Sequence, residues 1–254
     1  MRCAAPTTSQ LAQDRKTSNG QHVNIRERIS DVLHAEAAAV AAVRVDDSYE
    51  RTIRALVDVR GKVLTTGMGK AGHVAAKFAS TLCSTGTPAF YVHPGEAAHG
   101  DLGSITPGDC LVAFSASGKT IEVLEMLRRG REVGLSTIIS ITSHPNSELR
   151  TLSDIVLEMG IISEPCSLGL TPSASTTVML AISDALALTL MELKGFSVAD
   201  FGARHHGGYL GAKARSRTRS DVVPSTPPVP LTTTVPFKGD GQTRLLGTAG
   251  RTRG

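Results

Sequence analysis

CLVAFSASGKTIEVLEMLRRG, at residues 110–130, joins three kinds of local sequence in one order. Its unbroken apolar start predicts a buried strand over residues 110–115, because strands covered on both faces lack polar alternation. Apolar residues at helical spacing then predict a helix over residues 120–133. The loop between them is rich in Ser, Thr and Gly. The stretch is therefore one strand–loop–helix unit of a parallel sheet.

The same alternation extends in both directions from this unit. Short apolar runs predict four further strands, at residues 62–66, 89–92, 137–141 and 155–159. Helical patterns lie between them at residues 71–83 and at about 146–152. Alternating strands and helices predict right-handed βαβ units. We therefore expect an α/β fold, a three-layer, doubly wound, flavodoxin-like arrangement of five parallel strands.

Helices are also expected before and after the sheet. Apolar residues recur at helical spacing from Val23 to about Val59, with an interruption near residues 46–48, which predicts two N-terminal helices. A last helix is expected over residues 173–193, with Thr171 as its N-cap and Pro172 in the first helical position. This segment is apolar on most sides, so we expect it to be buried, and a second subunit could cover part of it.

The two ends of the chain differ from its middle. Residues 1–21 are expected to be flexible, residues 22–211 to form the folded domain, and residues 212–254 to be a disordered, basic tail rich in Pro and Thr. The formal net charge is +4, but the tail alone holds eight Lys and Arg and two Asp, which leaves −2 for the rest. A slightly acidic domain with only 4% aromatic residues predicts no nucleic-acid partner.

Composition also predicts the cellular setting. The four cysteines form no C-x-x-C pair, so neither a disulfide framework nor a zinc ribbon is indicated. The first residues contain no apolar run that could serve as a signal-peptide core, and the most apolar later segment is interrupted by Asp184. We expect a cytoplasmic protein with no membrane partner.

Two glycine-bearing loops resemble nucleotide-binding motifs. GMGKAG at residues 67–72 is a complete G-x-G-x-x-G, but the next strand ends in Tyr-Val-His at 91–93 rather than in the acidic residue that would hold a ribose. Residues 113–120 read A-x-x-x-x-G-K-T and lack the first glycine of a P-loop, and no strand ends in the aspartate that helps to hold magnesium. Both nucleotide interpretations are disfavoured, and no cofactor is expected.

A phosphate monoester fits the second loop better. Ser115, Ser117 and Thr120 place three hydroxyl groups at a helix start, where free N–H groups and the helix dipole attract an anion. A second cluster opens the last helix in the same way, and capping alone would also account for any one of its members: Thr171, Ser173, Ser175 and Thr176. The sequence therefore predicts a site for one phosphate group.

Together these motifs closely resemble the sugar isomerase (SIS) domain of the arabinose 5-phosphate isomerases. The resemblance runs from about Ile25 to Gly211, in order and at matching spacing. It rests on GMGKAGH at 67–73, STGTP at 84–88, HPGEAAHGDLG at 93–103, SASGKT at 115–120, LGLTPSASTT at 168–177 and HHGG at 205–208. It implies interconversion of D-ribulose 5-phosphate and D-arabinose 5-phosphate, which feeds Kdo and lipopolysaccharide biosynthesis. It also implies a homotetramer whose active sites are shared between subunits.

The resemblance assigns roles to individual residues. Carried over motif by motif, the catalytic residues are Lys70, Glu122, Glu164 and His205, with His99 also at the sugar. The expected substrate-binding residues are Gly69, Ser84, Thr85, Ser115, Ser117, Thr120, Thr171 and Ser173. Aldose–ketose isomerisation independently requires a base, an acid and a cation, because a proton moves between adjacent carbons through an enediolate. A glutamate or a histidine could be the base, and Lys70 could stabilise the developing negative charge.

Two positions depart from the family pattern, since Lys119 replaces an acidic residue and His206 replaces a proline. The family's paired CBS domains are expected to be absent, because the basic tail follows the domain. A metal site in the segment HPGEAAH at 93–99 is disfavoured, because its spacing matches no zinc hydrolase, and no metal is expected. His144, which precedes Pro145, is expected in a surface turn.

Two alternative functions stay open at this point. One is a phosphosugar-binding regulator without catalysis, although no DNA-binding module is visible in the first 60 residues. The other is an isomerase of a related hexulose or heptulose phosphate, which motif spacing does not exclude.

Overall fold

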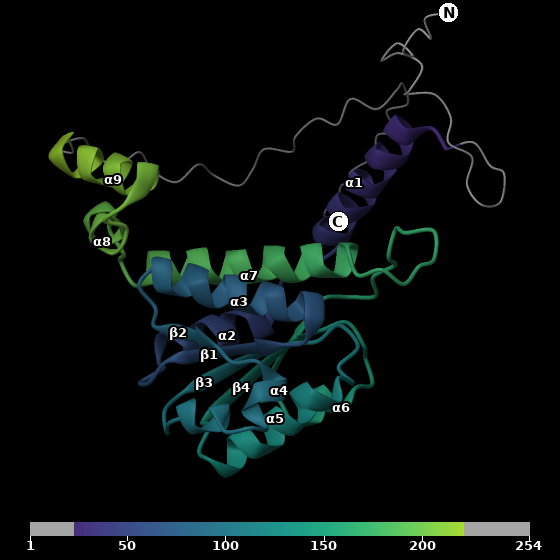
Figure 1. Ribbon diagram of the computed structural model, residues 1–254, viewed down its shortest axis with the longest axis horizontal. Helices are drawn as coiled ribbons and strands as arrows, with labels where there is room; N and C mark the ends of the chain where they lie inside the picture. The colour runs from purple at the N-terminus through teal and green to yellow at the C-terminus, as the bar shows by residue number, and fades with distance from the viewer. Residues whose placement is uncertain (1–22, 221–254) are drawn as a thin grey trace, which may run out of the picture. The chain divides into compact units, whose positions relative to one another are not determined.

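A five-stranded parallel sheet lies at the centre of the computed structural model, which describes residues 23–220 (Figure 1). The strands are β1 (Val63–Gly67), β2 (Ala89–Tyr91), β3 (Cys110–Phe114), β4 (Thr137–Thr142) and β5 (Ile155–Glu158). They lie in the order β2-β1-β3-β4-β5, and all neighbouring pairs are parallel. The predicted fold class is confirmed, and each strand lies within one residue of its expected bounds.

The chain changes direction across the sheet after β2. β1 pairs with β2 on one side and with β3 on the other, where Val63 lies opposite Cys110 and Gly67 opposite Phe114. The helices that follow these two central strands cover opposite faces, since α3 (Gly69–Ser84) joins one apolar core and α5 (Ile121–Glu132) joins the other. In open sheets of this kind, the crevice outside the carboxyl ends of the strands at such a switch point is where ligands bind.

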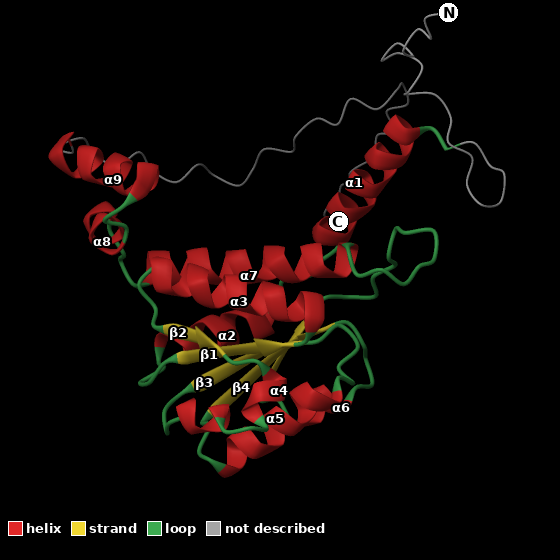
Figure 2. Cartoon of the chain, in the orientation of Figure 1, coloured by secondary structure: helices red, strands yellow, loops and turns green. Residues whose placement is uncertain are grey.

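Two apolar cores separate the sheet from the helices on its two faces. Alternate residues of a strand point to opposite faces, and in β3 Cys110, Val112 and Phe114 join one core while Leu111 and Ala113 join the other. The first core is covered by α2 (Asp47–Val57), α3 and α7 (Ala174–Leu193), and the second by α4 (Pro94–Ala97), α5 and α6 (Glu148–Thr151) (Figure 2). Burial on both faces explains why β3 is apolar throughout, whereas the edge strand β2 is only partly buried.

The two predicted N-terminal helices are present. α1 (Ile25–Ala41) begins after Asn24, whose Oδ1 accepts the N–H of Glu27 at 3.3 Å. α2 begins after Asp46, whose Oδ1 accepts the N–H of Ser48 at 2.9 Å. The predicted interruption is therefore a helix start defined by its N-cap. α1 has no buried residue, and its C-terminal part packs against the start of α7 (Figure 1).

Helix α7 is long and apolar, and its predicted burial is confirmed for one face. Val178, Ile182, Leu186 and Leu190 are buried against the sheet side of the domain. Among the described residues, α7 has the length and composition of a membrane-spanning helix, and half of it is buried inside the domain, as expected of a core helix. The helix begins at Ala174 with Ser173 in the N-cap position, so the prediction that Thr171 is its N-cap was wrong.

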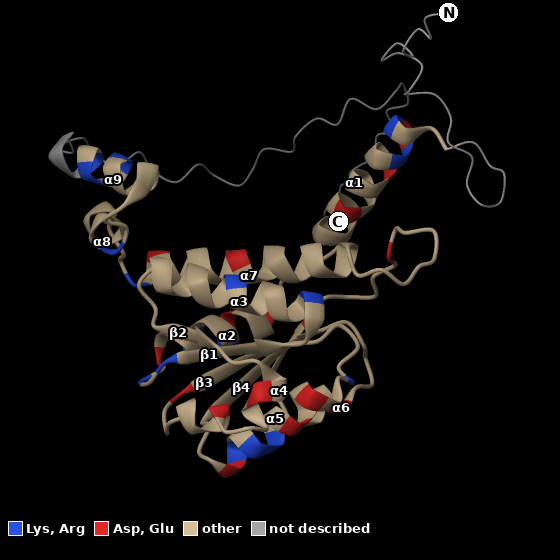
Figure 3. Cartoon of the chain, viewed as in Figure 1, with Lys and Arg blue, Asp and Glu red and all other residues tan. Residues whose placement is uncertain are grey.

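Two short helices follow α7, namely α8 (Val198–Arg204) and α9 (Gly208–Ser220). Residues 212–220 are helical, so the expectation that disorder begins at residue 212 was wrong for this part. α9 carries Lys and Arg and no Asp or Glu. Figure 3 shows the Lys and Arg residues of the chain in blue and the Asp and Glu residues in red. The predicted flexible segment 1–21 and the rest of the predicted tail lie outside the described residues.

Candidate functional site

The loop between β3 and α5 forms a polar cradle at the carboxyl edge of the sheet. Ser115 Oγ accepts the N–H of Gly118 at 3.1 Å and lies 3.1 Å from Thr120 Oγ1. Ser117 Oγ accepts the N–H of Lys119 at 3.2 Å. Thr120 is the N-cap of α5, but its side chain caps no N–H group, so the first turn can still donate to an anion. The structure thus brings three predicted phosphate ligands to one helix start.

Neighbouring loops fix the backbone of this cradle. Gly118 has a φ of +60°, and a Cβ at this position would lie 2.3 Å from Ser147 Oγ and 2.5 Å from Ser147 Cβ. The carbonyl oxygen of Ala116 accepts the N–H groups of Ser143 at 3.0 Å and His144 at 3.2 Å, both in the loop between β4 and α6. Glycine is therefore required at residue 118, both by its conformation and by the close approach of Ser147.

The loop after β1 borders the same switch point. Lys70 is exposed in the first turn of α3, next to Gly69, which has a φ of +58°. A Cβ on Gly72 would lie 2.6 Å from the carbonyl oxygen of Gly67 and 2.8 Å from Tyr91 Oη. The glycine motif at residues 67–72 is thus explained by close packing of α3 on β1. Since β1 and β3 are neighbours, Lys70 lies at the same edge of the sheet as the cradle.

Glu164 lies in the segment between β5 and α7 and caps α7. Its Oε2 accepts the N–H of Ser173 at 2.8 Å and the Ser173 hydroxyl at 3.1 Å, and its Oε1 accepts the N–H of Ser175 at 3.3 Å. Partial burial raises the pKa of Glu164, but hydrogen bonds from Ser175 and Ser173 outweigh it and lower the pKa overall. Glu164 is therefore an ionised carboxylate at neutral pH, held at the helix start. This contact also explains why α7 begins after Ser173 rather than after Thr171.

The same segment contains a thiol of lowered pKa. The backbone N–H groups of Thr171 and Leu170 donate to Cys166 Sγ at 3.2 and 3.3 Å. Hydrogen bonds from Thr171 and Leu170 lower the pKa of Cys166 to about 7. Thr171 is exposed and contacts Cys166, whereas Ser173 is in direct contact with Glu164.

A cavity of about 430 Å³ lies at the carboxyl ends of β3, β4 and β5, against the start of α7. It is lined by Ala116, Ser143, His144, Pro145, Ile161, Ile162, Glu164, Pro172 and Ser175. Ala116 belongs to the cradle, so the cradle and the cavity with Glu164 adjoin. The prediction that His144 lies in a surface turn overlooked this cavity. Its place in the loop after the predicted strand 137–141 was the signal that could have indicated it.

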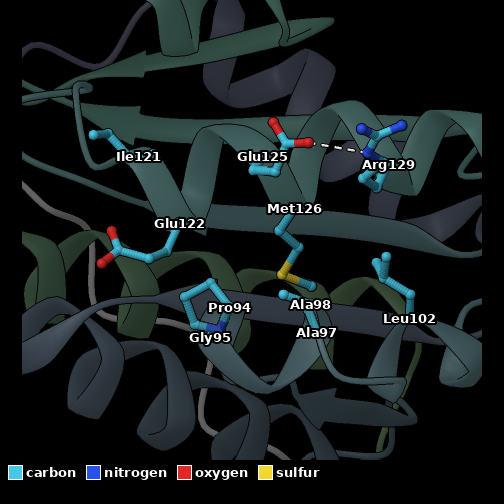
Figure 4. A pocket seen from close by; sticks show the side chains of 10 residues that line it. All are labelled: Pro94, Gly95, Ala97, Ala98, Leu102, Ile121, Glu122, Glu125, Met126 and Arg129. Carbon is cyan, nitrogen blue, oxygen red and sulfur yellow. Dashed lines mark hydrogen bonds and ion pairs between the residues drawn. The ribbon is translucent and has the colours of Figure 1, made fainter.

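Glu122 and His99 lie on the other face of the sheet. Glu122 is exposed in the first turn of α5 and lines a pocket of about 230 Å³ between α4 and α5 (Figure 4). Figure 4 places it on the same helix as Glu125, whose Oε1 accepts a hydrogen bond from Arg129 Nε at 2.9 Å. His99 is exposed after α4 and does not line this pocket. Within residues 23–220, no group of three or more His, Cys, Asp and Glu side chains gathers as a metal site would.

Three predicted site residues lie at or beyond the C-terminal ends of α3 and α7. Ser84 is the last residue of α3, and Thr85 Oγ1 donates to the carbonyl oxygen of Thr81 at 2.8 Å. His205 follows α8, and its ring stacks on Phe201 at a centroid distance of 3.8 Å. Helices α3 and α7 lead from one edge to the other, and the 20 residues of α7 span about 30 Å. A single chain therefore does not bring Ser84, Thr85 or His205 to Glu164 (Figure 1).

Comparison with known proteins gives consistent results. A profile of the SIS domain matches residues 55–189. The chain is similar to the arabinose 5-phosphate isomerase KdsD of Pseudomonas aeruginosa, at 42% identity over 71% of this chain and 55% of the relative. It is also similar to the arabinose 5-phosphate isomerase KpsF of Escherichia coli, at 43% identity over 72% of this chain and 57% of the relative. It thus spans a little over half the length of these curated relatives.

Solved structures agree with the sequence comparisons. A protein of E. coli CFT073 solved in complex with A5P is 41% identical, with a TM-score of 0.69 over 72% of this chain and 97% of that chain.

Proposed function

This chain belongs to the SIS domain family, and on that premise we propose that it is an aldose–ketose isomerase that interconverts D-ribulose 5-phosphate and D-arabinose 5-phosphate. The relatives that carry the name arabinose 5-phosphate isomerase are 42 and 43% identical to it. The reaction would take place in the cytoplasm and feed Kdo and lipopolysaccharide biosynthesis, as the sequence motifs imply. No cofactor is required by this chemistry.

One observation carries the proposal. The hydroxyl cradle at the start of α5 adjoins, through Ala116, a cavity that contains the carboxylate of Glu164. A helix start of this kind favours a phosphate dianion. An ionised carboxylate beside it can accept a proton from a carbon next to a carbonyl group. A pentose 5-phosphate has a phosphate at one end and its reacting carbons at the other, which suits this arrangement.

The chemistry follows from the groups at this edge. A base removes a proton from C1 of the ketose, and the electron pair of that C–H bond moves to form the C1–C2 double bond of an enediolate while negative charge develops on O2. Lys70 stabilises this charge, and a proton moves from O1 to O2 through an acid. Returning a proton to C2 gives the aldose. Either a glutamate or a histidine among Glu122, Glu164, His99 and His205 serves as the base.

The placement of His205 supports a shared site. Glu164 is bound to the start of α7, and His205 lies beyond its end, about 30 Å along the helix axis. Only a second copy of the chain could place His205 beside Glu164. We propose a homotetramer in which one subunit supplies the cradle, Lys70 and Glu164, and a neighbour supplies His205. Ser84 and Thr85 lie at the end of α3, which contacts the end of α7, and would enter the site in the same way.

The test is conversion of D-ribulose 5-phosphate to D-arabinose 5-phosphate by the purified full chain. We expect Glu164→Gln and His205→Ala to lower kcat at least about a hundredfold, the effect of removing a general acid or base. The matched control is Glu132→Gln, an exposed residue at the end of α5 that pairs with Arg129. Surface pairs of this kind contribute little, so its kcat should equal that of the wild type.

The substrate panel should include pentose, hexose and heptose phosphates. Binding of a sugar phosphate without turnover at any pH would contradict catalysis and favour a phosphosugar-binding regulator. Turnover of a hexulose or heptulose phosphate in place of ribulose 5-phosphate would contradict the proposed substrate. Full activity of the Glu164→Gln/His205→Ala double variant would contradict the assigned roles. Analytical ultracentrifugation tests the tetramer directly.

A further inference from the structure

His144 lies in the loop between β4 and α6 and lines the same cavity as Glu164. Both of its backbone groups are engaged, because its N–H donates to the carbonyl oxygen of Ala116 at 3.2 Å and its carbonyl oxygen accepts Arg150 Nε at 2.7 Å. Arg150 in turn forms an ion pair with Glu158 at the end of β5. The position of His144 is therefore fixed by the loop after β3 and, through Arg150 of α6, by the end of β5.

The imidazole ring of His144 is restrained as well. Its Nδ1 accepts the N–H of Asn146 at 3.3 Å. Since a backbone N–H can only donate, Nδ1 must carry the lone pair, and the neutral ring carries its proton on Nε2. Such a ring offers one hydrogen-bond donor to a ligand, in a direction set by the loop. A restrained donor loses little conformational entropy when it binds.

The cavity around His144 combines donors, an acceptor and apolar walls. Glu164 supplies an ionised acceptor, and Ser143 and Ser175 also line the cavity, with the Ser175 side chain hydrogen-bonded to Glu164. The Ser143 hydroxyl oxygen is buried and has no hydrogen-bond partner among the described residues. Ile161 and Ile162 line the remainder. A chain of hydroxylated carbons matches this mixture, because each hydroxyl group both donates and accepts and each carbon contacts an apolar wall.

We propose that His144 orients the sugar chain of the substrate by donating a hydrogen bond from Nε2 to one of its hydroxyl oxygens, and thereby contributes to sugar specificity. The inference rests on the proposed function, since it places the phosphate in the cradle and the sugar chain in the adjoining cavity. Ala116 is common to both, and its carbonyl oxygen is bonded to the His144 N–H. A ligand that reaches from the cradle toward Glu164 therefore passes His144.

The experiment measures binding rather than turnover. D-arabinitol 5-phosphate keeps the phosphate and the hydroxyl groups but has no carbonyl group, so it cannot be isomerised. Its Kd and that of inorganic phosphate are measured by calorimetry for the full chain and for His144→Phe, His144→Ala and His144→Gln. Phenylalanine keeps the ring shape without a donor, alanine removes the ring without adding volume, and glutamine retains an N–H donor. His34→Phe, on the exposed face of α1, is the control.

We expect the Kd of arabinitol 5-phosphate to rise about tenfold in His144→Phe and His144→Ala, as for one lost hydrogen bond. The Kd of inorganic phosphate should stay within about twofold, and His144→Gln should bind the analogue more tightly than His144→Ala. An unchanged Kd for the analogue, an equal loss of inorganic phosphate affinity, or no binding of the analogue to the wild type would each overturn the inference. If the wild type binds the analogue but isomerises no sugar phosphate, the proposed function is contradicted. The Kd values of the His144 variants then still decide whether His144 binds the sugar chain.

Discussion

Replacing Gly118 with alanine tests whether the cradle depends on the close approach of the loop between β4 and α6. The substitution adds one methyl group to a residue with a φ of +60°. This Cβ would lie 2.3 and 2.5 Å from the Oγ and Cβ atoms of Ser147, and 3.1 Å from Thr142 Oγ1. Rotation of the Ser147 side chain relieves only the first of these contacts, because its Cβ is attached to the backbone.

The expected loss of stability has two parts. The left-handed conformation costs a residue with a Cβ about 1–2 kcal/mol, and overpacking a buried contact costs about 1–3 kcal/mol. Gly195→Ala separates the two, because Gly195 has a φ of +62° and open space around its Cβ position. We expect Gly195→Ala to lower the free energy of unfolding by about 1–2 kcal/mol and Gly118→Ala to lower it by about 3 kcal/mol.

Urea unfolding of the single variants and of Gly118→Ala/Ser147→Gly gives the free energies and the coupling between the two positions. Ser147→Gly removes both clashing atoms, so the double variant should regain about 1–2 kcal/mol relative to additivity. The Kd of inorganic phosphate should rise in Gly118→Ala and not in Gly195→Ala. If Gly118→Ala were no less stable than Gly195→Ala, or if the coupling energy were zero, the packing argument would be refuted.

Two further predictions concern titratable groups. Because N–H groups of Thr171 and Leu170 lower the pKa of Cys166 to about 7, iodoacetamide should modify Cys166 with a rate that is half-maximal near pH 7. Burial raises the pKa of Cys110 to about 12, so Cys110 should react only on unfolding. Peptide mass mapping distinguishes the two cysteines. Burial raises the pKa of Asp109, but hydrogen bonds from Lys62 and Thr106 outweigh this effect and lower the pKa overall. The ionised Asp109 therefore stabilises the fold fully above the pKa of about 3.9 that it has in the unfolded chain, and this stabilisation is lost as the pH falls through its pKa in the folded protein. Asp109→Asn should therefore lower the free energy of unfolding by about 3 kcal/mol at pH 7, measured in urea, and should reduce the sensitivity to acid; equal stability of the variant and the wild type would contradict this.

The sheet could be predicted from sequence because its central strands, β1 and β3, are buried on both faces. Val112 and Leu111 point into different cores, yet both are apolar, so the run stands out from its surroundings. The cradle could be predicted as well, because Ser115, Ser117 and Thr120 are neighbours in the chain. Local signals of this kind require no knowledge of distant contacts.

Other parts of the site depend on contacts between distant segments. The start of α7 is set by the carboxylate of Glu164, which lies outside the helix. Local sequence alone favoured Thr171 as the N-cap, and this prediction was wrong because it could not include the contact with Glu164. The cavity with His144 is formed where three strands end, and the spacing of one motif does not show it. The roles assigned to His205, Ser84 and Thr85 remain predictions, because they require a second chain.

The length of α7 has a genetic consequence under the proposed assembly. A chain with a mutation in the cradle and a chain with a mutation at His205 would each form an inactive enzyme when expressed alone. In a cell that carries both alleles, mixed tetramers would contain some intact active sites, each with the unmutated cradle of one chain and the unmutated His205 of the other. The two inactive alleles would then complement each other, whereas two alleles that are both mutated in the cradle, or both mutated at His205, would not.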